Sequence, residues 1–83
     1  MSRIASMAQS RAARALLDWS MGDLSEAAQV SISTVRRLED GRQRVTSGRA
    51  VALVQRALEA RGVCFLLDDE LGLGVTLKEV AGR

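Results

Sequence analysis

The chain has 83 residues, enough for one small domain, and 47% hydrophobic with 27% charged residues is a composition typical of a folded protein. Its single cysteine excludes an intrachain disulfide, and the absence of histidine excludes a Cys/His zinc set, so we expect no metal and no cofactor. Since the N-terminal residues show no signal-peptide pattern and no apolar run could span a bilayer, we expect a cytoplasmic protein that does not bind membranes.

Charge is distributed unevenly, although the net charge is only +2. Residues 1–62 contain ten arginines against six acidic residues, a balance of +4, whereas residues 63–83 have a balance of −2. Eleven of the twelve basic residues are arginine, whose planar fork of donors suits phosphates and base edges. A solvated surface explains the composition alone equally well.

The first predicted helix covers about residues 6–18, where alanine, the best helix former, is frequent. An apolar stripe follows helical spacing and is expected to face the core. It consists of Ile4, Ala8, Ala12, Ala15, Leu16 and Trp19.

Two short helices follow, with a brief connection at residues 29–31. Ser20 is a suitable N-cap with Asp23 three residues later, although a complete capping box prefers Glu or Gln there. Ser31 caps the next helix, residues 32–40, and Gly41 is the residue expected to end it. The positions predicted to be buried are all apolar: Leu24, Ala28, Val30, Val35 and Leu38.

A basic loop then leads to a fourth helix at about residues 47–60, capped by Thr46 and ended by Gly62. Residues 63–67 and 75–77 favour strands, and the polar residues 68–74 favour a longish loop between them. The predicted fold is therefore mainly α, a bundle of about four helices with a short C-terminal β-hairpin. We expect residues 1–62 to form the helical domain and residues 63–83 a hairpin extension and tail that can mediate dimerisation.

The stretch from Ser20 to Gly41 carries the functional signal. Its turn is too short for the two helices to lie antiparallel, so they must cross steeply, as in a DNA-binding helix-turn-helix. The exposed face of the second of these helices presents Ile32, Ser33, Arg36 and Arg37. A face of uncharged and basic residues suits insertion into a major groove.

These residues resemble the lambda-repressor-like, or XRE-type, helix-turn-helix proteins of phages and bacteria. The family pattern is roughly W-S-Q-x-x-L-A-x-x-x-x-V-S-x-x-T-[IV]-x-x-[IL]-E-x-G. This chain matches it at Trp19-Ser20, Leu24, Val30-Ser31, Thr34-Val35, Leu38-Glu39 and Gly41, and the resemblance covers about residues 11–62. It implies a lambda-repressor-like fold and double-stranded DNA as the partner.

The resemblance also implies individual roles. Ile32, Ser33 and Arg37 fall where family members contact base edges, and Arg36 lies beside them. Contacts to DNA phosphates are implied for Ser31, Arg42, Gln43 and Arg44. Arg14 and Glu39 occupy positions that form an interhelical salt bridge in many members, a structural role.

Four residues depart from the family pattern, of which Ser25 in place of the usual alanine is a mild change. Met21 stands where members usually have a DNA-contacting glutamine, and Gly22 stands where a good helix former is usual. Gln29 replaces a glycine common in the tight turn, where a positive φ would strain glutamine.

The sequence thus favours a repressor that acts by occlusion, bound as a homodimer to a pseudo-palindromic operator. We expect the hairpin, through Val63, Phe65, Leu67 and Val75, to form the dimer surface with the fourth helix. The alternative is an antitoxin-like or anti-activator module that binds a protein partner and uses the helix-turn-helix as scaffold. No nucleophile is paired with a base, so we expect no enzymatic activity.

Single residues with other chemistry favour structural roles. Trp19 is expected in the core between the first and fourth helices, and Cys64 is expected to be a buried small hydrophobe. Asp68, Asp69 and Glu70 lack the spacing of a calcium loop and are expected to form an exposed turn.

Overall fold

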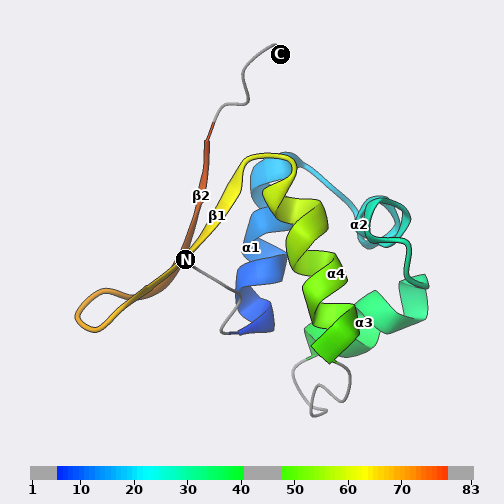
Figure 1. Ribbon diagram of the computed structural model, residues 1–83, viewed down its shortest axis with the longest axis horizontal. Coiled ribbons are helices and arrows are strands. Elements are labelled where there is room, and N and C mark those ends of the chain that lie inside the picture. Colours follow the sequence, from blue (N-terminus) through cyan, green and yellow to red (C-terminus); the bar gives the residue numbers. More distant parts are fainter. Residues whose placement is uncertain (1–5, 41–47, 79–83) are drawn as a thin grey trace.

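The computed structural model describes residues 6–40 and 48–78, and these form four helices followed by a two-stranded antiparallel hairpin (Figure 1). The helices are α1 (Met7–Leu17), α2 (Met21–Ala28), α3 (Ile32–Asp40) and α4 (Gly48–Glu59). The strands are β1 (Val63–Asp68) and β2 (Gly72–Leu77). The predicted fold class is confirmed. Among the described residues, no helix has the length and apolar character needed to cross a membrane.

The buried face of α1 differs from the predicted apolar stripe. Ala8, Ala12, Ala15 and Leu16 are exposed, whereas Gln9, Ser10 and Ala13 are buried together with Met7. Two polar residues can face inward because each finds a partner there. The amide nitrogen of Gln9 donates to the carbonyl oxygens of Leu66 and Gly74, at 3.0 and 2.9 Å, and so ties the hairpin to α1.

Local capping fixes the ends of α2 and the start of α3. The Ser20 hydroxyl accepts from the Asp23 N–H at 3.0 Å, and the Asp23 carboxylate accepts from the Ser20 N–H at 2.9 Å, so the capping box is complete despite the shorter acid. Gln29 ends α2 in the left-handed region with φ 59°. The Ser31 hydroxyl accepts from the Thr34 N–H at 3.1 Å, as an N-cap does. The predicted stop at Gly41 and cap at Thr46 lie outside the described residues.

The hairpin alternates its side chains between two faces. Gly62, with φ 96°, ends the helical part, and β1 pairs with β2 in a register that places Phe65 opposite Val75. Val63 and Phe65 are buried, whereas Cys64 between them is exposed. The prediction of a buried Cys64 was therefore wrong, because the strand period of two turns it away from the helices.

The turn of the hairpin is shorter than predicted. β2 begins at Gly72, not near Val75, so only residues 69–71 connect the strands. The Asp68 carboxylate accepts the N–H groups of Glu70 and Leu71, both at 2.8 Å, and closes the turn. These backbone hydrogen bonds, the one from Leu71 first, hold the pKa of the Asp68 carboxyl below its ordinary value.

One core joins the helices and the hairpin. Its fully buried large side chains include Leu24, Val35, Val54, Leu58 and Phe65, which come from α2, α3, α4 and β1. Buried Met7 and Ala13 of α1 belong to the same core. Trp19 packs against this core in a half-buried position, and the guanidinium of Arg61 lies 5.6 Å from its ring centroid. Val30, predicted to be buried, is also only half-buried. A core that includes Phe65 makes the start of the hairpin a structural part of the helical body.

Gln29 provides a test of backbone strain. A non-glycine residue in the left-handed region is destabilised by roughly 1–2 kcal/mol, and glycine avoids this penalty but loses more entropy on folding. We expect Gln29→Gly to raise the free energy of unfolding by up to about 1 kcal/mol, measured by urea denaturation. The control Ala27→Gly, at an exposed α2 position, should lower it by about 0.5–1 kcal/mol. A loss of stability in Gln29→Gly would contradict the strain.

Candidate nucleic-acid interface

The predicted pair of Arg14 and Glu39 is present and links α1 to α3. The Nη2 atom of Arg14 lies 2.8 Å from Oε1 of Glu39, and its Nε donates to both carboxylate oxygens at 3.1 Å. The Ser10 hydroxyl donates to Oε2 at 2.6 Å, and Arg11 donates to the Glu39 backbone carbonyl at 2.5 Å. Because the Glu39 side chain is fully buried, its carboxylate oxygens rely on Ser10 and Arg14 for their hydrogen bonds. They fix how α3 is placed on α1.

The other side of α3 rests on α2. The first turn of α2 lies beside Ile32, since a Cβ built on Gly22 would stand 3.9 Å from the Ile32 Cδ1 atom. Met21, another departure from the family pattern, is half-buried and packs against the core. The Met21 side chain therefore packs the first residue of α2 against the core.

The outward face of α3 carries the residues predicted to contact bases. Ser33, Arg36 and Arg37 are exposed, and Ile32 keeps 42% of its surface accessible although it is apolar. The inward face consists of Val35, Leu38 and Glu39, all buried. Asp40 adds one exposed acid at the end of the helix. All four residues predicted to contact bases therefore lie on the accessible side of α3, and the opposite side of the helix is fixed to α1 by Glu39.

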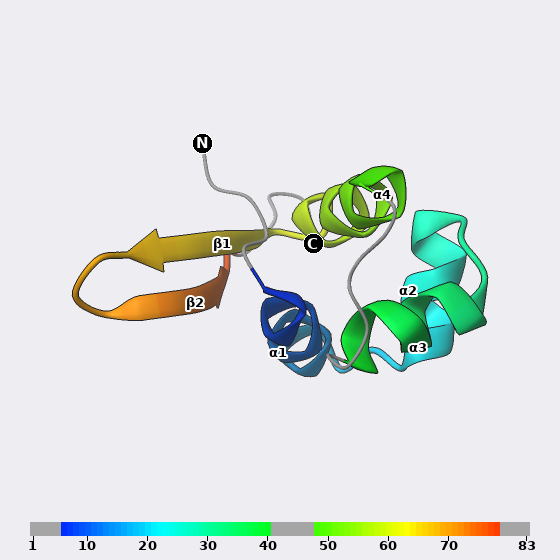
Figure 2. The same cartoon turned by 90° about the horizontal axis from the view of Figure 1, so that it is seen from below.

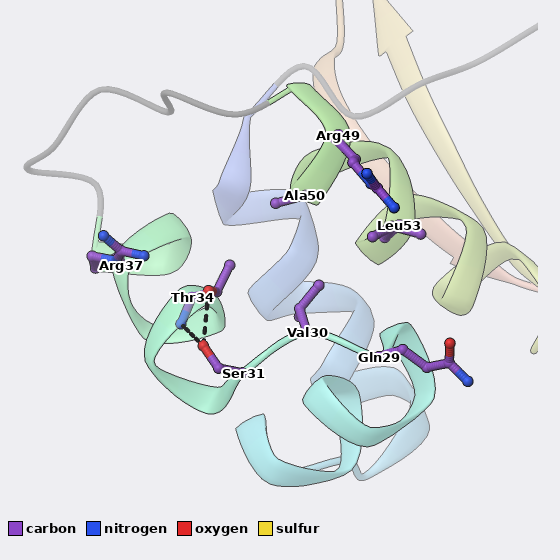
Figure 3. Close-up of a pocket in the computed structure, with 8 residues that line it drawn as sticks. All are labelled: Gln29, Val30, Ser31, Thr34, Arg37, Arg49, Ala50 and Leu53. Atoms are coloured by element: carbon purple, nitrogen blue, oxygen red, sulfur yellow. Dashed lines mark hydrogen bonds between the residues drawn. The ribbon is translucent and has the colours of Figure 1, made fainter.

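A shallow groove of about 390 Å³ lies beside this face, between α3, the turn that precedes it, and α4 (Figure 3). Arg37 comes from α3 and Arg49 from the first turn of α4, so two guanidinium groups line it. Val30, Ala50 and Leu53 supply apolar lining. The groove combines positive charge with hydroxyl groups, a chemistry that suits an anion.

Of the residues predicted to contact phosphates, the structure describes only Ser31. The Ser31 hydroxyl already caps α3 and lies 2.9 Å from the Thr34 hydroxyl, so a phosphate would share it with the helix. Arg42, Gln43 and Arg44 lie outside the described residues. Arg49 was not predicted from the sequence, because its place in a groove with Arg37 arises only when α3 and α4 pack together.

The residues predicted for dimerisation are divided by the fold. Val63 and Phe65 are buried within the chain, Val75 is half-buried, and Leu67 is 69% exposed. The first two already serve the core, and Leu67 is the member of the set that a partner can reach.

Comparison with known protein families gives a match to the helical part of the chain. The family model described as "Helix-turn-helix" (HTH_3) matches residues 11–58, from the middle of α1 to the last turn of α4. A search of curated proteins finds no match. Within the described residues, no group of His, Cys, Asp and Glu could hold a metal ion.

Glu39 allows the link between α1 and α3 to be tested. Removing one partner of a buried ion pair leaves the other uncompensated, and such losses amount to about 3–5 kcal/mol. We expect Glu39→Ala to lower the free energy of unfolding by about 3 kcal/mol, measured by urea denaturation with Trp19 fluorescence. Glu26→Ala, at an exposed position of α2, is the control and should change it by less than about 0.5 kcal/mol. Equal effects of the two variants would show that the pair does not fix the fold.

Proposed function

Because the chain belongs to the XRE-type helix-turn-helix family of DNA-binding transcription regulators, we propose that it is a repressor that recognises a specific operator through α3. The observation that carries this proposal is the outward face of α3, where Ile32, Ser33, Arg36 and Arg37 are all accessible. The buried Glu39 on the opposite side of the same helix holds that face in one orientation.

Each residue of this face has a specific chemistry for base edges. Arg37 can donate two hydrogen bonds to O6 and N7 of a guanine, and Ile32 can pack against a thymine methyl group. Ser33 can donate or accept, and Arg36 is placed for a base or the flanking backbone. Four side chains can read only a few base pairs, so the specificity of one copy is limited.

Phosphate contacts would surround the base contacts. We place Arg49 among them because it lines the groove beside α3 together with Arg37. The first turn of α3, with Ser31, offers backbone N–H groups to an anion. Arg42, Gln43 and Arg44, from the basic loop, complete the proposed set. Such contacts set affinity and salt dependence and carry no sequence information of their own.

A homodimer would supply the missing specificity. Two recognition helices related by a two-fold axis read a pseudo-palindrome whose half-sites lie one helical turn, ~34 Å, apart. Leu67 and the other exposed leucines of the hairpin offer apolar surface for a second copy.

A second candidate function is that of an antitoxin-like or anti-activator module that binds a protein partner. The half-buried Met21 favours it, since this side chain packs on the core at the position where relatives contact DNA. An antitoxin that represses its own promoter would combine both functions.

DNA binding can be tested by selecting sites from random duplexes and measuring affinity across salt concentrations. We expect Arg37→Ala to lose about 1–3 kcal/mol on the selected site and to relax the preference at one position. Arg49→Ala should weaken all sequences alike and reduce the salt slope by about one. Arg56→Ala is the control, because this arginine is also exposed on α4 but two turns further along.

The outcomes separate the candidates. Selection of a site with unchanged affinity in both Arg37→Ala and Arg49→Ala would refute the proposed interface. No selected site at all would refute the repressor and favour the interaction module.

The homodimer has its own test, sedimentation equilibrium with and without operator DNA. We expect a mass of twice the 8.9 kDa of one chain at micromolar concentration. A single-chain mass at high micromolar concentration, in both conditions, would exclude the dimer.

A further inference from the structure

The hairpin extends beyond the helices that cover its base. One face carries the register pairs Val63–Leu77, Phe65–Val75 and Leu67–Leu73. Toward the base, Phe65 is fully buried, but toward the turn Leu67 and Leu73 are 69% and 45% exposed. Leu71, in the turn, is 88% exposed. Figures 1 and 2 show the turn projecting away from the helices, so this apolar face continues without cover from its own chain.

A second uncovered surface lies on α1. Its outward residues Ala8, Ala12, Ala15 and Leu16 are exposed and follow one another at helical spacing. Gln9 on the neighbouring side of the same helix donates to Leu66 and Gly74, so this surface lies close to the middle of the hairpin. We call these four residues the alanine face.

The two surfaces are complementary in size and in charge. The hairpin presents large leucines, and the alanine face presents mostly methyl groups that leave room for them. The turn of the hairpin contains the acids Asp68, Asp69 and Glu70, whereas α1 contains no acid and its exposed Arg11 lies between Ala8 and Ala15 at the edge of the alanine face. Because the turn projects away from its own helices, this match can be used only by a different copy.

The dimensions favour the same arrangement. The long axis of the chain measures 33 Å, and the hairpin turn and α3 lie toward its opposite ends (Figure 1). Contact between two hairpin turns would hold the α3 helices much further apart than one helical turn of DNA, ~34 Å. Overlap of the hairpin with the helices of the partner shortens that separation.

We propose that each hairpin lies across the alanine face of a second copy of this chain, with Leu67, Leu71 and Leu73 packed on the α1 of that copy. The arrangement is reciprocal, since each copy has one hairpin and one alanine face, as a two-fold dimer requires. It leaves α3 free for DNA. The inference rests on the proposed homodimer and adds how the two copies are joined.

Sedimentation of surface variants tests which surfaces are used. Leu71→Lys removes the exposed leucine, and Ala12→Glu places an acid where the acidic turn would approach. Each should raise the dimer dissociation constant by roughly tenfold or more, with an unchanged thermal transition because both positions are exposed. Ala52→Glu, at an exposed alanine of α4, is the matched control and should leave the dimer intact. A dimer equally stable in all three variants would overturn the proposal.

Cross-linking distinguishes the modes of association. In a Cys64→Ser background, Ala12→Cys and Leu71→Cys are made in separate chains, mixed, and treated with a short bis-maleimide. We expect a cross-linked dimer in the mixture and little in either variant alone. Dimers formed by Leu71→Cys chains alone would show turn-to-turn contact and overturn the inference while the homodimer stands. A parent chain that is monomeric in sedimentation would instead overturn the proposed homodimer itself.

Discussion

The buried carboxylate of Glu39 is the constraint on which the rest of the structure depends. A charge without access to water is stable only if donors surround it, and here Arg14 and Ser10 from α1 supply them. These contacts join α1 to α3 at the buried end of the Glu39 side chain. The polar contact of Glu39 on one side of α3 therefore helps to keep Arg36 and Arg37 outward on the other side.

A second polar contact, made by Gln9 of α1, fixes the position of the hairpin on the helices. Two isolated strands are marginally stable, and the Gln9 amide secures them by donating to one carbonyl of each strand. Phe65 completes the attachment by filling the space between hairpin and helices. Since Ser10 and Gln9 are neighbours in sequence, one turn of α1 positions both α3 and the hairpin.

The sequence predicts these elements well where the information is local. The capping of α2 by Ser20 and Asp23, and the helix stop at Gly62, involve residues close together in the chain. The buried face of α1 was mispredicted because alanine is tolerated inside and outside, while the partners of Gln9 lie 57 and 65 residues away. The place of Arg49 in the groove was not predictable for the same reason, because the groove forms only when α3 and α4 pack together. The outward residues of α3 were predictable, since helical periodicity places them once Val35 and Leu38 are known to face inward.

The distribution of charge along the chain now has a spatial meaning. The basic surface of α3 and Arg49 lies at one end of the molecule, and the acidic turn with its leucines lies at the other (Figure 2). A negative turn beside the recognition helix would repel the phosphates, and distance removes that repulsion because charges beyond about 10 Å are largely screened at ordinary salt. The acids of the hairpin turn are therefore free to contact a protein, as proposed above, while Arg37 and Arg49 are free to contact DNA. In the proposed dimer, the hairpin would therefore set the spacing of the two copies without changing which bases each copy contacts.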